Sequence, residues 1–222
     1  MRAVWTIFVK DLRVEWRTRE TAVSMVVFGI LVIFLFNFSF NTGREETLRM
    51  LPGLLWIAFA FAGVLGFNRS FAAERENGCL EAVTLAPIDP GSIFVGKLLA
   101  NLVFLGFAEA VMVFVAALWY NFSFVPALGA FAAITFLGTL GYAALGTIFG
   151  AVAANTRMRE VMLPALQFPV AFWILVLASD ACSDALRGAD WKVVWGGIER
   201  VAGVSLVFTV ASFLLFEYVL EE

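Results

Sequence analysis

The stretch 93–119, IFVGKLLANLVFLGFAEAVMVFVAALW, decides the fold of this chain, because it is too long and too apolar for the core of a small soluble domain. Only two residues in it, Lys97 and Glu109, carry a charge. A helix needs about 20 apolar residues to cross a bilayer. Lipid offers the backbone no hydrogen-bond partners, so a spanning segment of this length must be helical. The stretch therefore predicts a transmembrane helix.

Similar apolar stretches lie on both sides of it. They predict five further spans, at about 21–40, 51–67, 127–154, 161–179 and 201–219. The whole chain is 62% hydrophobic and 15% charged, against roughly 45–50% and about 25% in soluble proteins. Six spans use ~120 residues and leave only ends and loops. We therefore expect residues 1–222 to form a single transmembrane domain of the all-α membrane class, with six transmembrane helices.

Residues 2–19 precede the first span and predict an amphipathic helix. Its apolar stripe is Trp5, Phe8, Leu12 and Trp16, and the basic residues beside the stripe are Lys10, Arg13 and Arg17. A tryptophan-containing stripe flanked by basic residues is typical of a helix that lies in the membrane interface. A soluble helix is the alternative, but a span follows directly, which favours the interfacial position.

The distribution of lysine and arginine predicts the orientation, because these residues concentrate on the cytoplasmic side. With the N-terminus inside, the inner segments hold Arg2, Lys10, Arg13, Arg17, Arg19, Arg69, Arg75, Lys97, Arg157 and Arg159, and the outer ones hold Arg44, Arg49, Arg187, Lys192 and Arg200. Lys97 is counted inside because a lysine at the start of a span can extend its ammonium group toward the interface. Both termini are therefore expected in the cytoplasm.

Composition also argues against several classes of function. The net charge of −3 gives no reason to expect nucleic-acid binding, and the chain has no histidine. Cys79 and Cys182 fall on opposite sides of the predicted membrane, so they cannot pair, and neither has metal-ligand spacing. We expect no metal or other cofactor bound by this chain, and no catalytic constellation inside the spans.

One phosphate-loop spacing occurs, at 91–97 (GSIFVGK), and we expect it to be fortuitous. The next residue is Leu98 rather than the serine or threonine that would hold Mg²⁺, and no strand precedes the motif. ATP is therefore expected to be bound by a partner chain.

The connector 68–92 is the longest charged segment between spans. Helical pattern runs over 69–76, Asn77-Gly78 predicts a turn, and a second helix over 79–86 ends at Pro87. A long, charged, cytoplasmic connector suits docking to a partner protein. A solvated loop is the alternative that the residues alone leave open.

The run ERENGCLEAVTLAPID at 74–89 resembles the cytoplasmic signature of type-2 ABC transporter permeases. The matching residues are Glu74, Arg75, Glu76, Gly78, Leu80, Glu81, Pro87, Gly96 and Lys97. In that family the connector carries a coupling helix that contacts the cytoplasmic ABC ATPase subunit. The resemblance implies that residues 74–87 couple the spans to such a subunit, and that the chain itself is not an enzyme.

Within that superfamily the chain most resembles the CcmB family, the haem exporter permeases of bacterial cytochrome c maturation. The resemblance rests on FNRSFAAERENGCLEA at 67–82, LAPID at 85–89 and LPALQFPV at 163–170. It implies a place in the bacterial inner membrane, with haem as the cargo of the complex. It also implies a second copy of the chain, haem-handling membrane proteins and a periplasmic haem chaperone as partners.

Two other readings of the function stay open from the sequence. The permease could carry a lipid, a polysaccharide or a drug in place of haem. The chain could also be a passive membrane scaffold without an ATPase partner.

Glu109 is the only acidic residue well inside a predicted span. A carboxylate in lipid is costly, so it must face protein or water. It could belong to a substrate path or a subunit interface. The reading that we favour is structural: a partner for Asn101, for a hydroxyl group or for a backbone group.

Three further patterns concern the shape of the bundle. Gly146, Gly150 and Ala154 form a small-residue ridge, which favours close packing within the chain over a dimer seam. Pro164 and Pro169 predict a kink in the fifth span. Residues 180–200 predict a short amphipathic helix or hairpin on the outer face, because Trp191, Val194, Trp195 and Ile198 share a helical spacing.

Overall fold

The computed structural model describes residues 2–39, 44–76, 89–154, 156 and 158–221. The helices are α1 (Arg2–Thr18), α2 (Glu20–Ser39), α3 (Arg44–Glu76), α5 (Pro90–Trp119), α6 (Leu128–Ala154), α7 (Arg159–Leu186) and α8 (Trp191–Glu221), with a short 3-10 helix, η1 (Val125–Ala127), before α6. The described residues contain no strand.

Six of these segments are long and apolar enough to cross a membrane. They are Glu20–Ser39, Arg49–Ser70, Pro90–Trp119, Val125–Ala154, Glu160–Leu186 and Trp191–Val219. The prediction of an all-α membrane protein with six transmembrane helices is confirmed. The helix predicted before the first span is present as α1, and it carries exposed tryptophans at positions 5 and 16.

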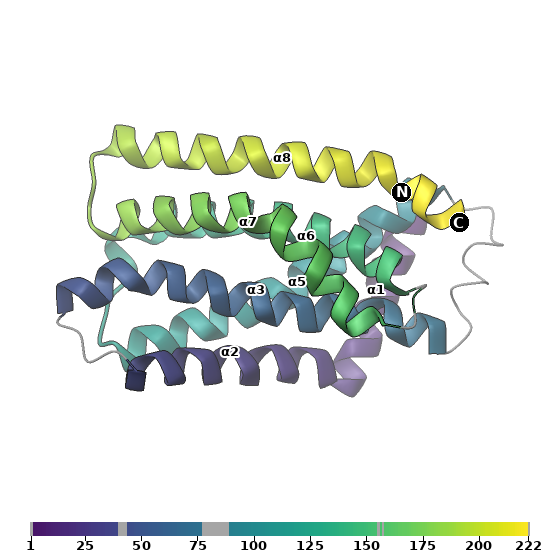
Figure 1. The fold of residues 1–222 in the computed structure, drawn as a ribbon, viewed down its shortest axis with the longest axis horizontal. Coiled ribbons are helices and arrows are strands. Elements are labelled where there is room, and N and C mark those ends of the chain that lie inside the picture. Colours follow the sequence, from purple (N-terminus) through teal and green to yellow (C-terminus); the bar gives the residue numbers. More distant parts are fainter. Residues whose placement is uncertain (1, 40–43, 77–88, 155, 157, 222) are drawn as a thin grey trace.

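The six long helices run side by side, and α1 lies across one end of the bundle (Figure 1). Helix α6 is central, because it packs against α3, α5, α7 and α8. Its glycines allow this close approach: a Cβ added at Gly146 would lie 2.2 Å from the ring of Phe67 on α3, and one added at Gly141 would lie 2.8 Å from Cα of Ser205 on α8. The small residues of α6 thus serve packing within the chain, as predicted.

The separate outer helix or hairpin predicted for 180–200 is wrong. Helix α7 continues to Leu186 and α8 begins at Trp191, so only residues 187–190 link them. The link turns at Gly188, whose φ is +70°, a backbone conformation that glycine adopts without strain. The periodic pattern at 191–198 was helical, as expected, but it belongs to the first turns of the sixth span.

Helix α7 changes direction in its first half, as the green ribbon in Figure 1 shows. Pro164 and Pro169 lie inside this helix. A proline inside a helix removes one backbone hydrogen bond and clashes with the preceding turn, which bends the helix. The bend predicted for the fifth span is therefore present.

Candidate functional site

The predicted coupling segment joins the end of α3 to the start of α5. Helix α3 extends beyond the predicted span to Glu76, so Glu74, Arg75 and Glu76 belong to its last turns. The other predicted coupling residues, Gly78, Leu80, Glu81 and Pro87, lie outside the described residues, as does the helix predicted at 79–86.

The start of α5 is set by Asp89. Its carboxylate Oδ2 accepts the backbone N–H of Ser92 at 3.0 Å, and Pro90 occupies the first helical position. An aspartate cap followed by proline is a strong signal for a helix start. Since α5 begins here, residues 91–97 lie in a helix and not in the loop that a phosphate-binding motif needs.

The end of α3 and the start of α5 lie at the same end of the bundle as α1 and as both chain ends (Figure 1). The predicted coupling segment therefore leaves and re-enters the bundle beside α1. This arrangement brings three elements together at the end of the molecule that the sequence assigns to the cytoplasm.

Gly96 is the point where α1 docks on α5. A Cβ at this position would lie 2.9 Å from Cβ of Ile7 and 3.1 Å from the carbonyl oxygen of Val4. Ile7 is also the buried residue of α1. The absence of a side chain at Gly96 thus lets the two helices cross in close contact.

Lys97, the next residue, ties three helices together. Its side chain is only 2% exposed, and its Nζ lies 3.4 Å from Oδ2 of Asp11 on α1. It also donates to the backbone oxygen of Ser70 on α3, at 3.4 Å. Lys10 approaches the other oxygen of Asp11 at 3.1 Å. The ammonium group of Lys97 thus extends toward the end of the bundle where α1 lies, and α1 covers it and supplies the counter-charge.

Asp11 was not among the predicted site residues. The signal was present, since Asp11 follows Ile7 by four positions and therefore lies on the same face of α1. That face is distinct from the tryptophan stripe, and it packs on α5 through Ile7. An acidic residue on the inward face of an interfacial helix is an indication of a buried basic partner.

Glu109 lies on α5, is 4% exposed, and has a hydroxyl partner. Thr139 on α6 donates its hydroxyl to Oε1 of Glu109 at 2.7 Å. Asn101 bonds a different residue, Thr147, at 3.0 Å. Of the structural partners considered for Glu109, the hydroxyl is therefore the one present.

Glu109 and Thr139 also line a cavity of about 680 Å³ between α5 and α6. Its other walls are mostly apolar and aromatic, with Phe114, Phe122, Phe124, Phe131 and Phe136 among them. One oxygen of the Glu109 carboxyl group thus accepts a hydrogen bond from Thr139. The same side chain lies at the wall of the cavity between α5 and α6. The reading of Glu109 as part of a path or an interface stays a prediction.

Among the described residues, no three histidine, cysteine, aspartate or glutamate side chains gather as metal ligands would. Cys182 is fully buried. The described part of the chain is thus a helical bundle in which polar side chains connect neighbouring helices. One such connection, made by Lys97, lies where α1 meets α3 and α5.

These features define a multi-pass α-helical membrane protein with an N-terminal helix docked across one end. The profile of the family described as "CcmB protein" matches residues 2–216 of the chain. The chain therefore belongs to the CcmB family.

Several curated relatives are similar over most of their length. Heme exporter protein B of Pseudomonas aeruginosa is 26% identical over 184 residues, which are 82% of this chain and 81% of the relative. Heme exporter protein B of Haemophilus influenzae is 26% identical over 201 residues, covering 90% and 89%. The protein of the same name from Bradyrhizobium diazoefficiens is 26% identical over 188 residues, covering 85% and 84%.

Proposed function

We propose that this chain is the membrane permease subunit of an ABC transporter complex for haem export or delivery in the biogenesis of c-type cytochromes. The observation that carries the proposal is the family match, which extends over residues 2–216. The names of the relatives point to haem as the cargo. We expect the whole chain, 1–222, to act as one transmembrane domain.

In this proposal the chain binds no ATP, and a cytoplasmic ABC ATPase subunit hydrolyses it. Residues 74–87, with Glu74, Arg75, Glu76, Gly78, Leu80, Glu81 and Pro87, contact that subunit. Two features support a coupling role for this end of the molecule. Helix α3 continues unbroken from the span to Glu76, and Lys97 bonds both α3 and α1. A movement of the connector would therefore be transmitted both to the span in α3 and to the N-terminal helix α1.

The complex contains two copies of the chain, two ATPase subunits and haem-handling membrane proteins. Movement of the spans delivers haem to a periplasmic chaperone or releases the loaded chaperone. The complex lies in the bacterial inner membrane, with both termini of this chain in the cytoplasm.

The test is the composition of the complex, purified through a tag on this chain in mild detergent. We expect an ATPase subunit in a one-to-one ratio with the chain, together with the absorbance of haem. A complex with an ATPase but with a bound lipid or glycan would instead assign another cargo. A chain that purifies without any ATPase would be a scaffold, and the proposal would be wrong.

A further inference from the structure

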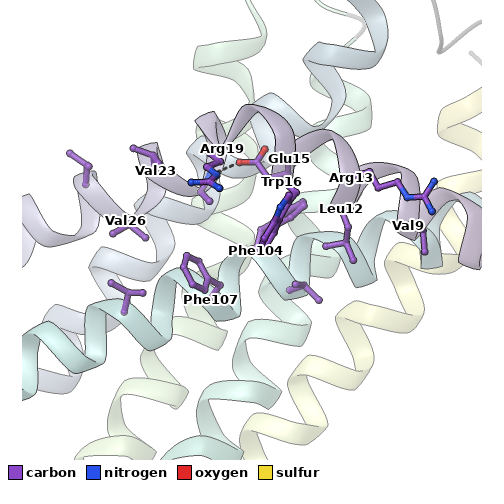
Figure 2. Close-up of a pocket in the computed structure, with 14 residues that line it drawn as sticks. Val9, Leu12, Arg13, Glu15, Trp16, Arg19, Val23, Val26, Phe104 and Phe107 are labelled. Carbon is purple, nitrogen blue, oxygen red and sulfur yellow. Dashed lines mark hydrogen bonds between the residues drawn. The ribbon is translucent and has the colours of Figure 1, made fainter.

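A long apolar groove lies where α1 and α2 meet and where α5 packs beneath both (Figure 2). Its volume is about 1140 Å³. Helices α1 and α2 both pack against α5 but hardly touch each other. The space between them is therefore left open along the side of the bundle.

The groove has apolar walls along α2 and α5, and its charged residues lie along α1 and the elbow after it. Along α2 and α5 its lining is entirely apolar, with Val23, Val26, Phe104 and Phe107 labelled in Figure 2. The charged lining residues, Arg13, Glu15 and Arg19, all lie in α1 or at the elbow that follows it. Two positive charges and one negative charge leave a net +1 along this side of the groove. The groove thus offers apolar walls for an acyl chain and a net positive charge for an anionic headgroup.

The elbow holds its charged groups in place. Oε1 of Glu15 accepts the backbone N–H of Ala22 at 2.7 Å, which commits this carboxylate to the start of α2. Arg19 has a φ of +56°, a left-handed conformation that turns the chain between the two helices. Its guanidinium lies 6.0 Å from the centre of the Trp16 ring. Within the described residues, neither Arg13 nor Arg19 has a carboxylate partner.

We propose that this groove binds one anionic phospholipid, with its phosphate against α1 between Arg13 and Arg19, which lie on either side of Trp16 (Figure 2), and an acyl chain along Val23, Val26, Phe104 and Phe107. Arginine binds phosphate oxygens through several N–H groups at once, and the exposed Trp16 ring is suited to the depth of the headgroups. A lipid in this position would fill the wedge between α1 and the first span. The proposal does not depend on the cargo of the transporter.

The experiment is native mass spectrometry of the full chain in mild detergent, after addition of phosphatidylglycerol or phosphatidylcholine with identical acyl chains. Wild type should retain phosphatidylglycerol over phosphatidylcholine. The double variant R13Q/R19Q should retain less phosphatidylglycerol, by about tenfold for each arginine removed, because each loses its hydrogen bonds to the charged phosphate. R17Q is the matched control, because Arg17 lies on the same helix, is exposed and does not line the groove. It should behave as wild type.

Four results would overturn the proposal. Wild type could retain both lipids equally, or the double variant could retain phosphatidylglycerol as wild type does. Inorganic phosphate at millimolar concentration could displace the lipid, which would assign a site for free phosphate. In native membranes, a photo-crosslinking residue at Val23 should gain the mass of a lipid, and a crosslink to a polypeptide there would assign the groove to a protein partner.

Discussion

The two charged residues inside the third span are held in different ways. Lys97 lies near one end of the span and meets an acidic residue, Asp11, and a backbone oxygen. Glu109 lies deeper, and its oxygen accepts a hydroxyl from Thr139. Ionisable groups inside a membrane protein face partners in this way because lipid cannot solvate them. Both contacts join α5 to another helix.

Replacement of Glu109 by glutamine should preserve both the fold and cytochrome c maturation. The amide oxygen can still accept the Thr139 hydroxyl, so the contact between α5 and α6 survives. Glu109→Leu removes the acceptor and should lower the free energy of unfolding by about 1 kcal/mol. Thermal unfolding in detergent and a maturation assay measure the two effects. A Glu109→Gln protein that unfolds like wild type but fails in maturation would instead place the carboxyl group in the transport step.

A residue could be recognised from the sequence as one that needs a partner where its place within an apolar stretch already implies a buried environment. Glu109 stands out because it is an acid in the middle of an apolar stretch, and a hydroxyl partner was among the expectations. Which residue supplies this hydroxyl could not be predicted, because Thr139 is 30 positions away on another helix. The pairing of Asp11 with Lys97 spans 86 positions. Helical periodicity tells which face a residue is on, but it does not tell which helix will pack there.

At the scale of elements, the junction of α1 with α5 depends on Gly96. We expect Gly96→Ala to lower the free energy of unfolding by about 1–3 kcal/mol, because the added methyl group collides with Ile7 and with the backbone of Val4. Gly106→Ala is the matched control on the same helix, since a Cβ there meets no atom within 4 Å. Thermal unfolding and limited proteolysis within α1 report the result. Equal stability of the two variants would show that α1 does not need this close contact.

The long helix α3 permits a test of coupling at its two ends. Glu76→Lys should leave the complex assembled but reduce cytochrome maturation by about tenfold or more, because reversed charge disturbs the contact through which ATP hydrolysis is coupled to the spans. Glu46→Lys makes the same change near the first turn of the same helix, at the far end of the bundle, where Glu46 is exposed. It should mature cytochromes normally. Normal maturation in both variants would remove Glu76 from the coupling site.

The existence of the six spans was predictable, but the ends of several were not. Hydropathy marks the part of a helix that lies in hydrocarbon, and a helix can continue into the polar region without any apolar signal. For this reason α3 extends past the predicted end at 67 to Glu76, and α8 begins at Trp191 rather than at 201. The same effect made residues 180–200 resemble a separate element. The start of α5 at Pro90 also precedes the predicted start of the span at 93, although Asp89 followed by Pro90 is a local signal for a helix start.

At the scale of the whole molecule, the proposed orientation has a simple test in the native cysteines. Cys182 is fully buried, so a maleimide should react with Cys79 alone. A membrane-impermeant maleimide should therefore leave intact spheroplasts unlabelled and should label the chain after permeabilisation. A Glu46→Cys variant is the control, because it should be labelled from outside. Labelling of the wild-type chain in intact spheroplasts would put the connector in the periplasm and would exclude coupling to a cytoplasmic ATPase.

The contact between Asp11 and Lys97 also sets an order of events during synthesis. The ribosome makes Asp11 early, but its partner follows 86 residues later. At 5–20 residues per second, this interval is roughly 4–17 seconds. During that time the nascent N-terminal helix must rest on the membrane surface while the first spans insert. We expect its exposed tryptophans, Trp5 and Trp16, to provide a temporary anchor there until the third span arrives and the junction closes.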